Sequence, residues 1–295
     1  DVIMPYNLSH RDTAIFNSNP LPTIKYNLLI NNDVTTIGIN EYKNKNLVSV
    51  TIPNSVTEIG NGAFFTNIIN SLTFEDGSSL LTIDESAFYS NKITSLRIPN
   101  SVTEIGITAF YNNDISSLTF EHDSSLSIIH RNAFSNNQIT SLKIPNSVTE
   151  ISQNAFFNND ISSLTFEGGS SLLTIGVNAF SKLHPAPVGT VYNNDITYLT
   201  IPNSVTEIGI AAFSNNGISY LTIGNSVETI GASAFKNNDI SSLRIPNSVE
   251  TIENNAFANN HNLSDVIMPY NLSGRKNDIF SSPIPTIKYS LVIAN

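Results

Sequence analysis

Apolar and polar residues alternate along the chain in short runs that predict extended strands. In one representative run, Leu96 and Ile98 alternate with Ser95 and Arg97, the period-two pattern of a strand with one buried face. Pro99 follows directly, and a proline lacks the amide hydrogen that would continue the strand. The pattern therefore predicts a short strand that ends at the proline and turns its two aliphatic side chains toward a core.

The residues after this strand predict the rest of a closed coil. Val102 and Ile105 indicate a second short extended segment, which a glycine ends. Ala109 and Phe110 are predicted to lie on one helical or 3₁₀ turn, with the phenylalanine filling the space between stacked coils. The Asn-Asn-Asp sequence at 112–114 closes the coil, since these residue types tolerate left-handed backbone geometry.

This unit recurs along nearly the whole chain. From Phe64 to Phe180 the phenylalanines are spaced alternately by 24 and 22 residues, so the local period is a pair of units. One member of the pair carries Ile-Pro-Asn-Ser-Val and the other carries Phe-Glu-x-x-Ser-Ser-Leu. About twelve units follow, anchored at Phe16, Tyr42, Phe64, Phe88, Phe110, Phe134, Phe156, Phe180, Phe213, Phe235, Phe257 and Phe280.

Two features interrupt the regularity. The step from Phe180 to Phe213 is 33 residues, so eleven residues, 181–191, are inserted there, and their prolines predict a loop. Residues 1–9 are identical to 265–273. The sequence thus predicts one solenoid domain over 1–295, with near-duplicate terminal repeats at 1–30 and 265–294. The duplication indicates either a segment of a longer array with a super-period of 264 residues or a shared capping unit, and the apolar stretch 287–293 favours the array.

A single unit cannot bury its own apolar residues, so units must stack with their strands in a parallel sheet. The repeated pattern Leu-x-Ile-Pro-x-Ser-Val-x-x-Ile-Gly-x-x-Ala-Phe resembles the BspA-type leucine-rich repeat of bacterial and some protozoan surface proteins. The resemblance implies a β-rich α/β solenoid: a right-handed superhelix of about 12 coils of 22–24 residues with a parallel β-sheet on one face. It also implies an adhesive or protein-binding role. The 24-residue units, the insertion and the asparagines where some relatives carry cysteine depart from the family pattern.

Composition excludes several classes of function. With 24 acidic and 14 basic side chains the net charge is −10, which disfavours binding to nucleic-acid phosphates. The absence of cysteine rules out disulfides and thiolate metal sites. No apolar run reaches the roughly 18 residues of a membrane span, so we expect no membrane insertion in this segment. Together with the resemblance, this predicts an extracellular or cell-surface location, with the signal and anchor outside the segment.

Chemical motifs are scarce. The five histidines form no metal-binding pair, although His122 and His130 share a repeat with acidic residues, and neither a Gly-x-Ser-x-Gly elbow nor a phosphate-binding loop is present. We therefore predict no enzyme, no catalytic residues, no cofactor and no metal. The recurrent Asn-Asn-Asp turns admit two interpretations, namely a row of calcium sites or, preferred here, an internal ladder of asparagine hydrogen bonds. The recurrent glutamates in Val-Thr-Glu-Ile could attract cations but are better explained as a solvated face.

The outward face of the predicted strands is the best candidate for a binding surface. It carries columns of serine and threonine that solubility and strand pairing alone could explain. Two tyrosines interrupt these columns next to the inserted loop, and tyrosine is enriched at interface hot spots. Insertions in repeat proteins map to loops, often on the binding face. The candidate binding residues are Arg97, Lys143, His184, Tyr198, Thr200, Tyr220, Thr222 and Arg244.

Three functions remain open on the sequence. The preferred hypothesis is a non-enzymatic, adhesin-like module that binds a host or neighbouring-cell surface or matrix protein through the sheet face and the inserted loop. The second is a structural stalk or spacer of a longer array, whose near-identical ends permit end-to-end self-association. The third is a glycan-binding module that uses the tyrosines and the hydroxyl columns.

Overall fold

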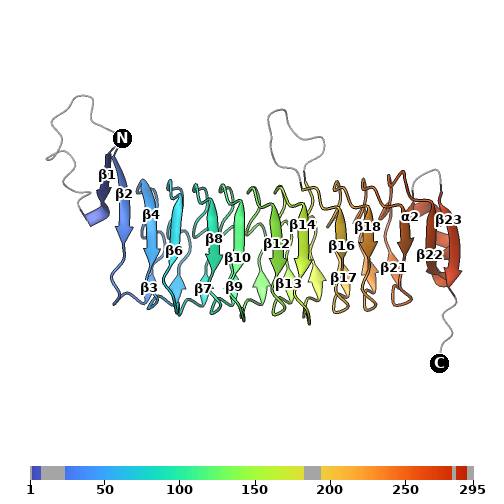
Figure 1. Ribbon diagram of the computed structural model, residues 1–295, viewed down its shortest axis with the longest axis horizontal. Helices are drawn as coiled ribbons and strands as arrows, with labels where there is room; N and C mark the ends of the chain where they lie inside the picture. The colour runs from blue at the N-terminus through green and yellow to red at the C-terminus, as the bar shows by residue number, and fades with distance from the viewer. Residues whose placement is uncertain (1, 8–23, 183–193, 281–283, 291–295) are drawn as a thin grey trace. The chain divides into compact units, whose positions relative to one another are not determined.

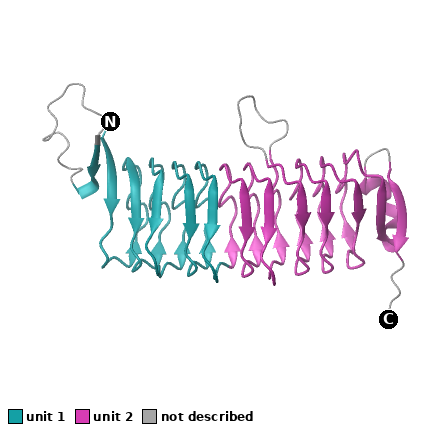
Figure 2. Ribbon diagram, in the orientation of Figure 1, with its two compact units in different colours: residues 1–126 teal, residues 127–295 magenta. Residues whose placement is uncertain are grey.

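The computed structural model describes residues 2–7, 24–182, 194–280 and 284–290 (Figure 1). The chain divides into two compact units, residues 1–126 and 127–295 (Figure 2). In each unit a coil consists of a longer strand, a turn, a strand of two residues and a second segment of turns that leads to the next coil. The coils follow one another along the unit, so each strand lies beside the corresponding strand of the next coil (Figure 1).

Unit 1 contains two rows of parallel strands. The pair β8–β10 continues the row of longer strands beyond the sheet β1-β2-β4-β6, and each two-residue strand pairs with the next one along the chain. The longer strands are β1 (Val2–Pro5), β2 (Ile24–Leu29), β4 (Leu47–Ile52), β6 (Ser71–Phe74), β8 (Ser95–Ile98) and β10 (Ser117–Phe120). The two-residue strands are β3 (Thr36–Ile37), β5 (Glu58–Ile59), β7 (Thr82–Ile83) and β9 (Glu104–Ile105).

Unit 2 repeats this plan and ends in a short helical segment, η2 (Tyr270–Arg275) followed by α2 (Lys276–Ile279). Its longer strands are β12 (Ser141–Ile144), β14 (Ser163–Phe166), β16 (Tyr198–Thr200), β18 (Tyr220–Thr222), β20 (Ser242–Arg244), β22 (Asp265–Pro269) and β23 (Thr286–Ser290). Its two-residue strands are β11 (Ile128–Ile129), β13 (Glu150–Ile151), β15 (Thr174–Ile175), β17 (Glu207–Ile208), β19 (Thr229–Ile230) and β21 (Thr251–Ile252).

The predicted strand alternation is confirmed. In β8, Leu96 and Ile98 are buried while Ser95 and Arg97 are exposed, and Leu96 lies opposite Leu118 of the parallel strand β10. The second extended segment is also confirmed as β9, in which Ile105 is buried. The fold is thus a parallel-sheet β-solenoid of about twelve turns with little helix, as the repeat pattern predicts.

The Ala-Phe pair was predicted to lie on one helical or 3₁₀ turn; it lies in a single turn closed by Tyr111 N and Thr108 O at 3.1 Å, and no helix forms there. Thr108 and Asn112 flank the pair with φ of +54° and +57°, and left-handed residues on both sides prevent a helix from forming. The backbone instead makes tight turns, such as the one closed by Ala109 N and Gly106 O at 3.2 Å. Alternate amides bond the next coil, as Phe88 N does to Ala109 O at 2.8 Å. This edge is therefore a third hydrogen-bonded ladder.

The core of each unit is a column of stacked aromatic rings. Phe64, Phe88 and Phe110 of unit 1 are fully buried, with neighbouring ring centroids 4.9 and 5.2 Å apart and nearly parallel planes. In unit 2 the column runs from Phe134 to Phe280. Because every coil contributes one ring at the same position, each coil buries its phenylalanine only against its neighbours.

The insertion leaves this column intact. Phe180 and Phe213, which it separates in sequence, stack at 5.3 Å with planes 6° apart, and Ile175 still pairs with Ile208. Most of the predicted loop 181–191 lies outside the described residues, but Ser181 is buried at the point where the chain leaves the coil. The aromatic column and the strand pairing thus continue across the insertion.

The two terminal repeats share one strand pairing. Strand β1 pairs with β2 so that Val2 lies opposite Ile24, and β22 pairs with β23 so that Val266 lies opposite Ile287. Strand β2 also pairs on its other side with β4, whereas β23 has no second partner among the described strands. The tyrosines at equivalent positions reflect this difference. Tyr26 of β2 is 7% exposed, whereas Tyr289 of β23 is 39% exposed.

Candidate functional site

The outward face of the longer strands in unit 2 carries the candidate site. Ser141 pairs with Ser163 in the column that precedes the tyrosines, and in β16 and β18 the paired residues at this position are Tyr198 and Tyr220. Both tyrosines are exposed, by 71% and 57%, and their ring centroids lie 6.2 Å apart with planes tilted by 38°. Behind them Thr200 pairs with Thr222. Tyr198 and Tyr220 are therefore exposed neighbours on the strand face, and their role in binding stays a prediction.

The three predicted basic residues differ in their surroundings. In unit 1, Arg97 forms an ion pair with Glu121 at 3.3 Å. In unit 2, Lys143 forms one with Glu167 at 2.9 Å. Both glutamates stand two residues after the residue opposite the cation on the next strand. Exposed pairs of this kind contribute little to stability, but they neutralise the charge that a ligand would meet.

Arg244 has no such glutamate. It lies opposite Ile267 on β22, and two residues further the chain has Pro269. Asp265, an acidic residue of the groove lining on the adjacent strand β22, forms an ion pair with Lys288 at 3.1 Å. Among the described residues no hydrogen-bond acceptor or carboxylate pairs with the Arg244 guanidinium. This arginine therefore presents an uncompensated positive charge on the sheet face.

The tyrosines, the threonines behind them and Arg244 line one groove of about 1280 Å³ in unit 2. Residues of strands β14, β16, β18, β20 and β22 line it, together with residues of the turns that follow several of these strands. The groove brings together five of the predicted residues, Tyr198, Thr200, Tyr220, Thr222 and Arg244. Lys143 reaches it only through its ion pair with Glu167, Arg97 belongs to unit 1, and His184 lies outside the described residues.

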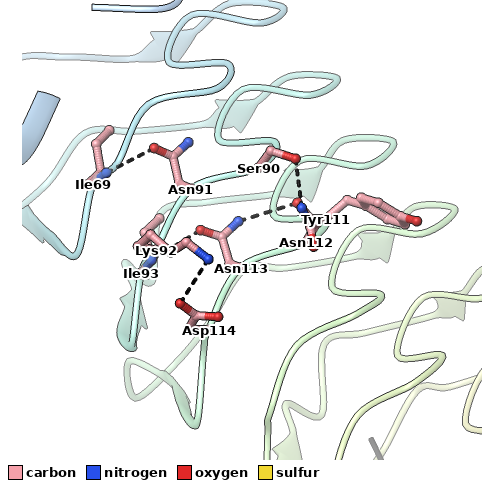
Figure 3. Close-up of polar contacts among 9 residues, drawn as sticks. All are labelled: Ile69, Ser90, Asn91, Lys92, Ile93, Tyr111, Asn112, Asn113 and Asp114. Carbon is pink, nitrogen blue, oxygen red and sulfur yellow. Dashed lines mark hydrogen bonds and ion pairs between the residues drawn. The ribbon is translucent and has the colours of Figure 1, made fainter. Parts of the chain in front are cut away.

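The Asn-Asn-Asp turns form a hydrogen-bonded ladder, as preferred on sequence grounds. Asn113 is 2% exposed, and its Nδ2 donates to Phe88 O at 2.9 Å and to Phe110 O at 3.2 Å. Its Oδ1 accepts from Ile93 N at 3.2 Å, and Asn91 does the same for Ile69 N (Figure 3). The second asparagine of the turn thus ties two coils together and satisfies backbone groups that water cannot reach.

The first asparagine of each turn has a different role. Asn112 takes up the left-handed conformation, and its amide donates to Ser90 Oγ at 2.9 Å (Figure 3). In unit 2, Asn158 donates to Asn136 in the same way at 3.1 Å. Within the described ranges, no group of three or more histidine, aspartate or glutamate side chains is placed to hold a metal ion.

Comparison with known protein families identifies the repeat. A model described as "BspA type Leucine rich repeat region (6 copies)" matches residues 13–125, 120–185 and 189–292. The chain belongs to the BspA-type leucine-rich repeat family. Family membership explains the packing of this BspA-type protein, but a repeat motif leaves the ligand open.

Several solved structures resemble this BspA-type chain. The pneumococcal vaccine antigen PcpA is 21% identical, with 81% of this chain and 68% of that one covered and a TM-score of 0.49. A leucine-rich cell surface protein from Faecalibacterium prausnitzii is 21% identical, with 87% and 83% covered and a TM-score of 0.39. A leucine-rich repeat protein from Eubacterium ventriosum is 18% identical, with 92% and 83% covered and a TM-score of 0.41. The comparison with curated proteins finds no match.

The BspA-type repeat contains no membrane-spanning helix in the part of the chain that the structure describes. Its recurrent glutamates lie on the two-residue strands, where they alternate with threonine, as Glu58, Thr82 and Glu104 do in unit 1. Asp84 is the residue directly after strand β7, which contributes Thr82 to this row. Burial, reinforced by the charges of Glu58 and Glu104, raises the pKa of the Asp84 carboxyl above its usual range.

Replacing this aspartate, Asp84→Asn, is expected to raise the melting temperature at pH 7. A raised pKa in the folded state means that the charged carboxyl opposes folding, so the penalty is present above the folded-state pKa and is lost as the pH falls below the ordinary aspartate value of about 3.9. The advantage of the variant should therefore disappear in melts near pH 3. The exposed neighbour Glu85, changed to glutamine, is the control. Equal melting of Asp84→Asn and the original chain at pH 7 would contradict the assignment.

Sequence reasoning identified the tyrosines but not the groove around them. It treated the three basic residues as equivalent, because each occupies the same place in its strand. Whether each cation is paired depends on one residue of the following coil. That residue is Glu121 for Arg97, Glu167 for Lys143 and Pro269 for Arg244. That comparison is available in the printed sequence once the strand register is known.

Proposed function

We propose that this chain is a non-enzymatic recognition module of a bacterial surface or secreted protein, and that it binds a protein partner through the groove on the sheet face of unit 2. The observation that carries the proposal is the exposed pair Tyr198 and Tyr220, which replaces a serine column in the lining of a groove. Exposed aromatic side chains are strongly enriched among residues that dominate protein interfaces. The family supports a surface or secreted setting.

The experiment is a pull-down of purified extracellular-matrix and serum proteins on the immobilised chain. The test variant changes Tyr198 and Tyr220 together to serine, the residue that other coils carry at this position, so the strands should be undisturbed. The control variant changes Tyr270, which is also exposed but lies outside the groove. We expect a captured protein to be lost on the double substitution and retained on the control. Capture that survives the double substitution would refute the groove as the site.

The inserted loop is tested in the same assay by deleting residues 181–191. Because Phe180 and Phe213 stack directly, the deletion should leave the core intact. Loss of the captured partner would place the loop in the interface alongside the tyrosines. Unchanged capture would restrict the interface to the groove. A panel of glycans, applied to the same variants, tests carbohydrate binding as the competing use of these tyrosines.

A structural function as a spacer is the second candidate, and the shared pairing of the terminal repeats favours it. The β22–β23 pair has the register of β1–β2, yet its Tyr289 remains 39% exposed where Tyr26 is covered. A further coil of the same type would cover this edge. Sedimentation velocity over a range of concentrations tests self-association. Reversible assembly would support joining of copies, and a monomer at every concentration would count against it.

A further inference from the structure

We infer that the groove in unit 2 selects an acidic peptide segment, with Arg244 holding a carboxylate and the two tyrosines contacting the neighbouring side chains. This inference deepens the proposed function and rests on it. It names the chemistry of the partner at the site, which the tyrosines alone leave undefined. It depends on three observations: the pairing of charges around the groove, the location of Arg244 and the arrangement of the tyrosine rings.

Among the described charged residues in and beside the groove, one cation has no anionic partner. The groove lining contains Glu167, Arg244 and Asp265, and the two carboxylates are already bound by Lys143 and Lys288. These five residues give a net charge of +1. The chain as a whole carries −10, so this local surplus of positive charge runs against the general acidity of the molecule. An acidic group complements it, whereas a basic ligand would meet like charge.

The guanidinium is suited to a carboxylate. Arginine presents a planar set of donors that can bind both oxygens of a carboxylate at once, and such charge-assisted bonds are stronger than neutral ones. Arg97 has the same strand position in unit 1, and there Glu121 occupies the place in front of the guanidinium. The Arg97–Glu121 pair therefore shows that a carboxylate can occupy this position, and Arg244 has no such partner among the described residues.

The rest of the groove fits an extended peptide better than a sugar ring that stacks its apolar face on an aromatic platform. The rings of Tyr198 and Tyr220 are tilted by 38°, so they form two separate surfaces and no single stacking platform. The groove crosses strands β16, β18, β20 and β22, and three strand spacings amount to roughly 14 Å, the length of about four extended residues. Hydroxyls of Thr200, Thr222 and Ser242 line this path and can bond a peptide backbone.

Fluorescence polarisation with three labelled heptapeptides tests the inference on the intact chain. The acidic probe is Gly-Ser-Tyr-Glu-Glu-Ser-Gly, and the matched probes carry two glutamines or two lysines in place of the glutamates. We expect the acidic probe to bind at least tenfold more tightly than either matched probe. Arg244→Gln should remove that preference, Arg244→Lys should restore part of it, and Arg97→Gln, outside the groove, should leave it unchanged. Equal melting temperatures establish that the variants remain folded.

The outcomes separate this inference from the proposed function. Equal binding of the three probes, or an acidic preference that survives Arg244→Gln, would overturn the carboxylate assignment. If a protein partner is nevertheless captured and then lost on the double tyrosine substitution, the proposed function stands and only the acidic chemistry fails. Tighter binding of an oligogalacturonate, lost in Arg244→Gln, would overturn the peptide assignment in favour of an acidic glycan. No capture and no probe binding would reject both.

Discussion

Replacing one buried ladder asparagine, Asn159→Ala, is expected to lower the free energy of unfolding by about 4 kcal/mol, since stranding a buried polar group costs about 1–3 kcal/mol. Asn159 is fully buried, and its Nδ2 donates to Phe134 O at 2.9 Å and to Phe156 O at 3.1 Å. Its Oδ1 accepts from Ile139 N at 3.1 Å. Alanine leaves Ile139 N without this acceptor, whereas Phe134 O and Phe156 O each lose one of two donors and keep Asn137 Nδ2 and Asn194 Nδ2. Each of these two lost bonds adds about 0.5–1.5 kcal/mol. Denaturant unfolding followed by circular dichroism measures the loss.

Two further substitutions test the cause of this loss. Asn159→Asp keeps the shape and one acceptor but removes both amide donors and places carboxylate oxygen against two carbonyl oxygens, so it should destabilise at least as much as alanine. Asn146→Ala, at an exposed turn position outside the ladder, should change the free energy of unfolding by no more than about 0.5 kcal/mol. Similar values for Asn159→Ala and Asn146→Ala would show that the ladder bonds do not stabilise the stack.

Removing one ring from the aromatic column, Phe156→Ala, should cost a comparable amount, about 3–5 kcal/mol. Phe156 is fully buried and stacks on Phe134 at 5.4 Å and on Phe180 at 5.3 Å. Alanine leaves a cavity that the neighbouring coils cannot close, because their ladder hydrogen bonds hold them at a fixed spacing. Hydrogen exchange should accelerate most in the two coils that flank the cavity, since each coil contacts only its neighbours.

The adjacent residue supplies the control for this second prediction. Phe157 has the same side chain one position along the turn but is only half-buried, so Phe157→Ala should cost less than half as much. Phe156→Leu should fall between the two, because it keeps much of the volume and loses the stacking. A loss from Phe157→Ala equal to that from Phe156→Ala would refute the aromatic column as the main apolar contribution to stability.

The periodic features of the fold could be read from the chain alone. The buried pair Leu96 and Ile98, the break at Pro99 and the recurrence of the phenylalanines are properties of each coil by itself, and they specify which side chains face inward. Identical coils can bury these groups only by stacking, so the parallel solenoid follows from the repeat. The turn at the Ala-Phe pair was foreseen, but the left-handed conformation of Thr108, which excludes a helix there, was not, because threonine rarely adopts that conformation unless the surrounding structure holds it.

The candidate site depends on contacts between coils. Asn112 and Asn113 are the same residue type in adjacent positions, and only the stacking decides that one bonds the core backbone while the other lies at the left-handed corner. Arg97 and Arg244 likewise share a strand position. Whether the cation is paired depends on the following coil, which supplies Glu121 in one case and Pro269 in the other.

The sequence by itself determined the period, the inward and outward faces, the position of the insertion and the family of this protein. The tertiary structure decided which asparagines are buried, which cation remains unpaired and how the tyrosines form a groove. The division has a physical reason. The hydrophobic pattern acts within one coil, at short range along the chain. The hydrogen bonds and ion pairs that join one coil to the next connect residues 20 or more positions apart, as Ile139 and Asn159 are, and they are defined only when the coils stack in register.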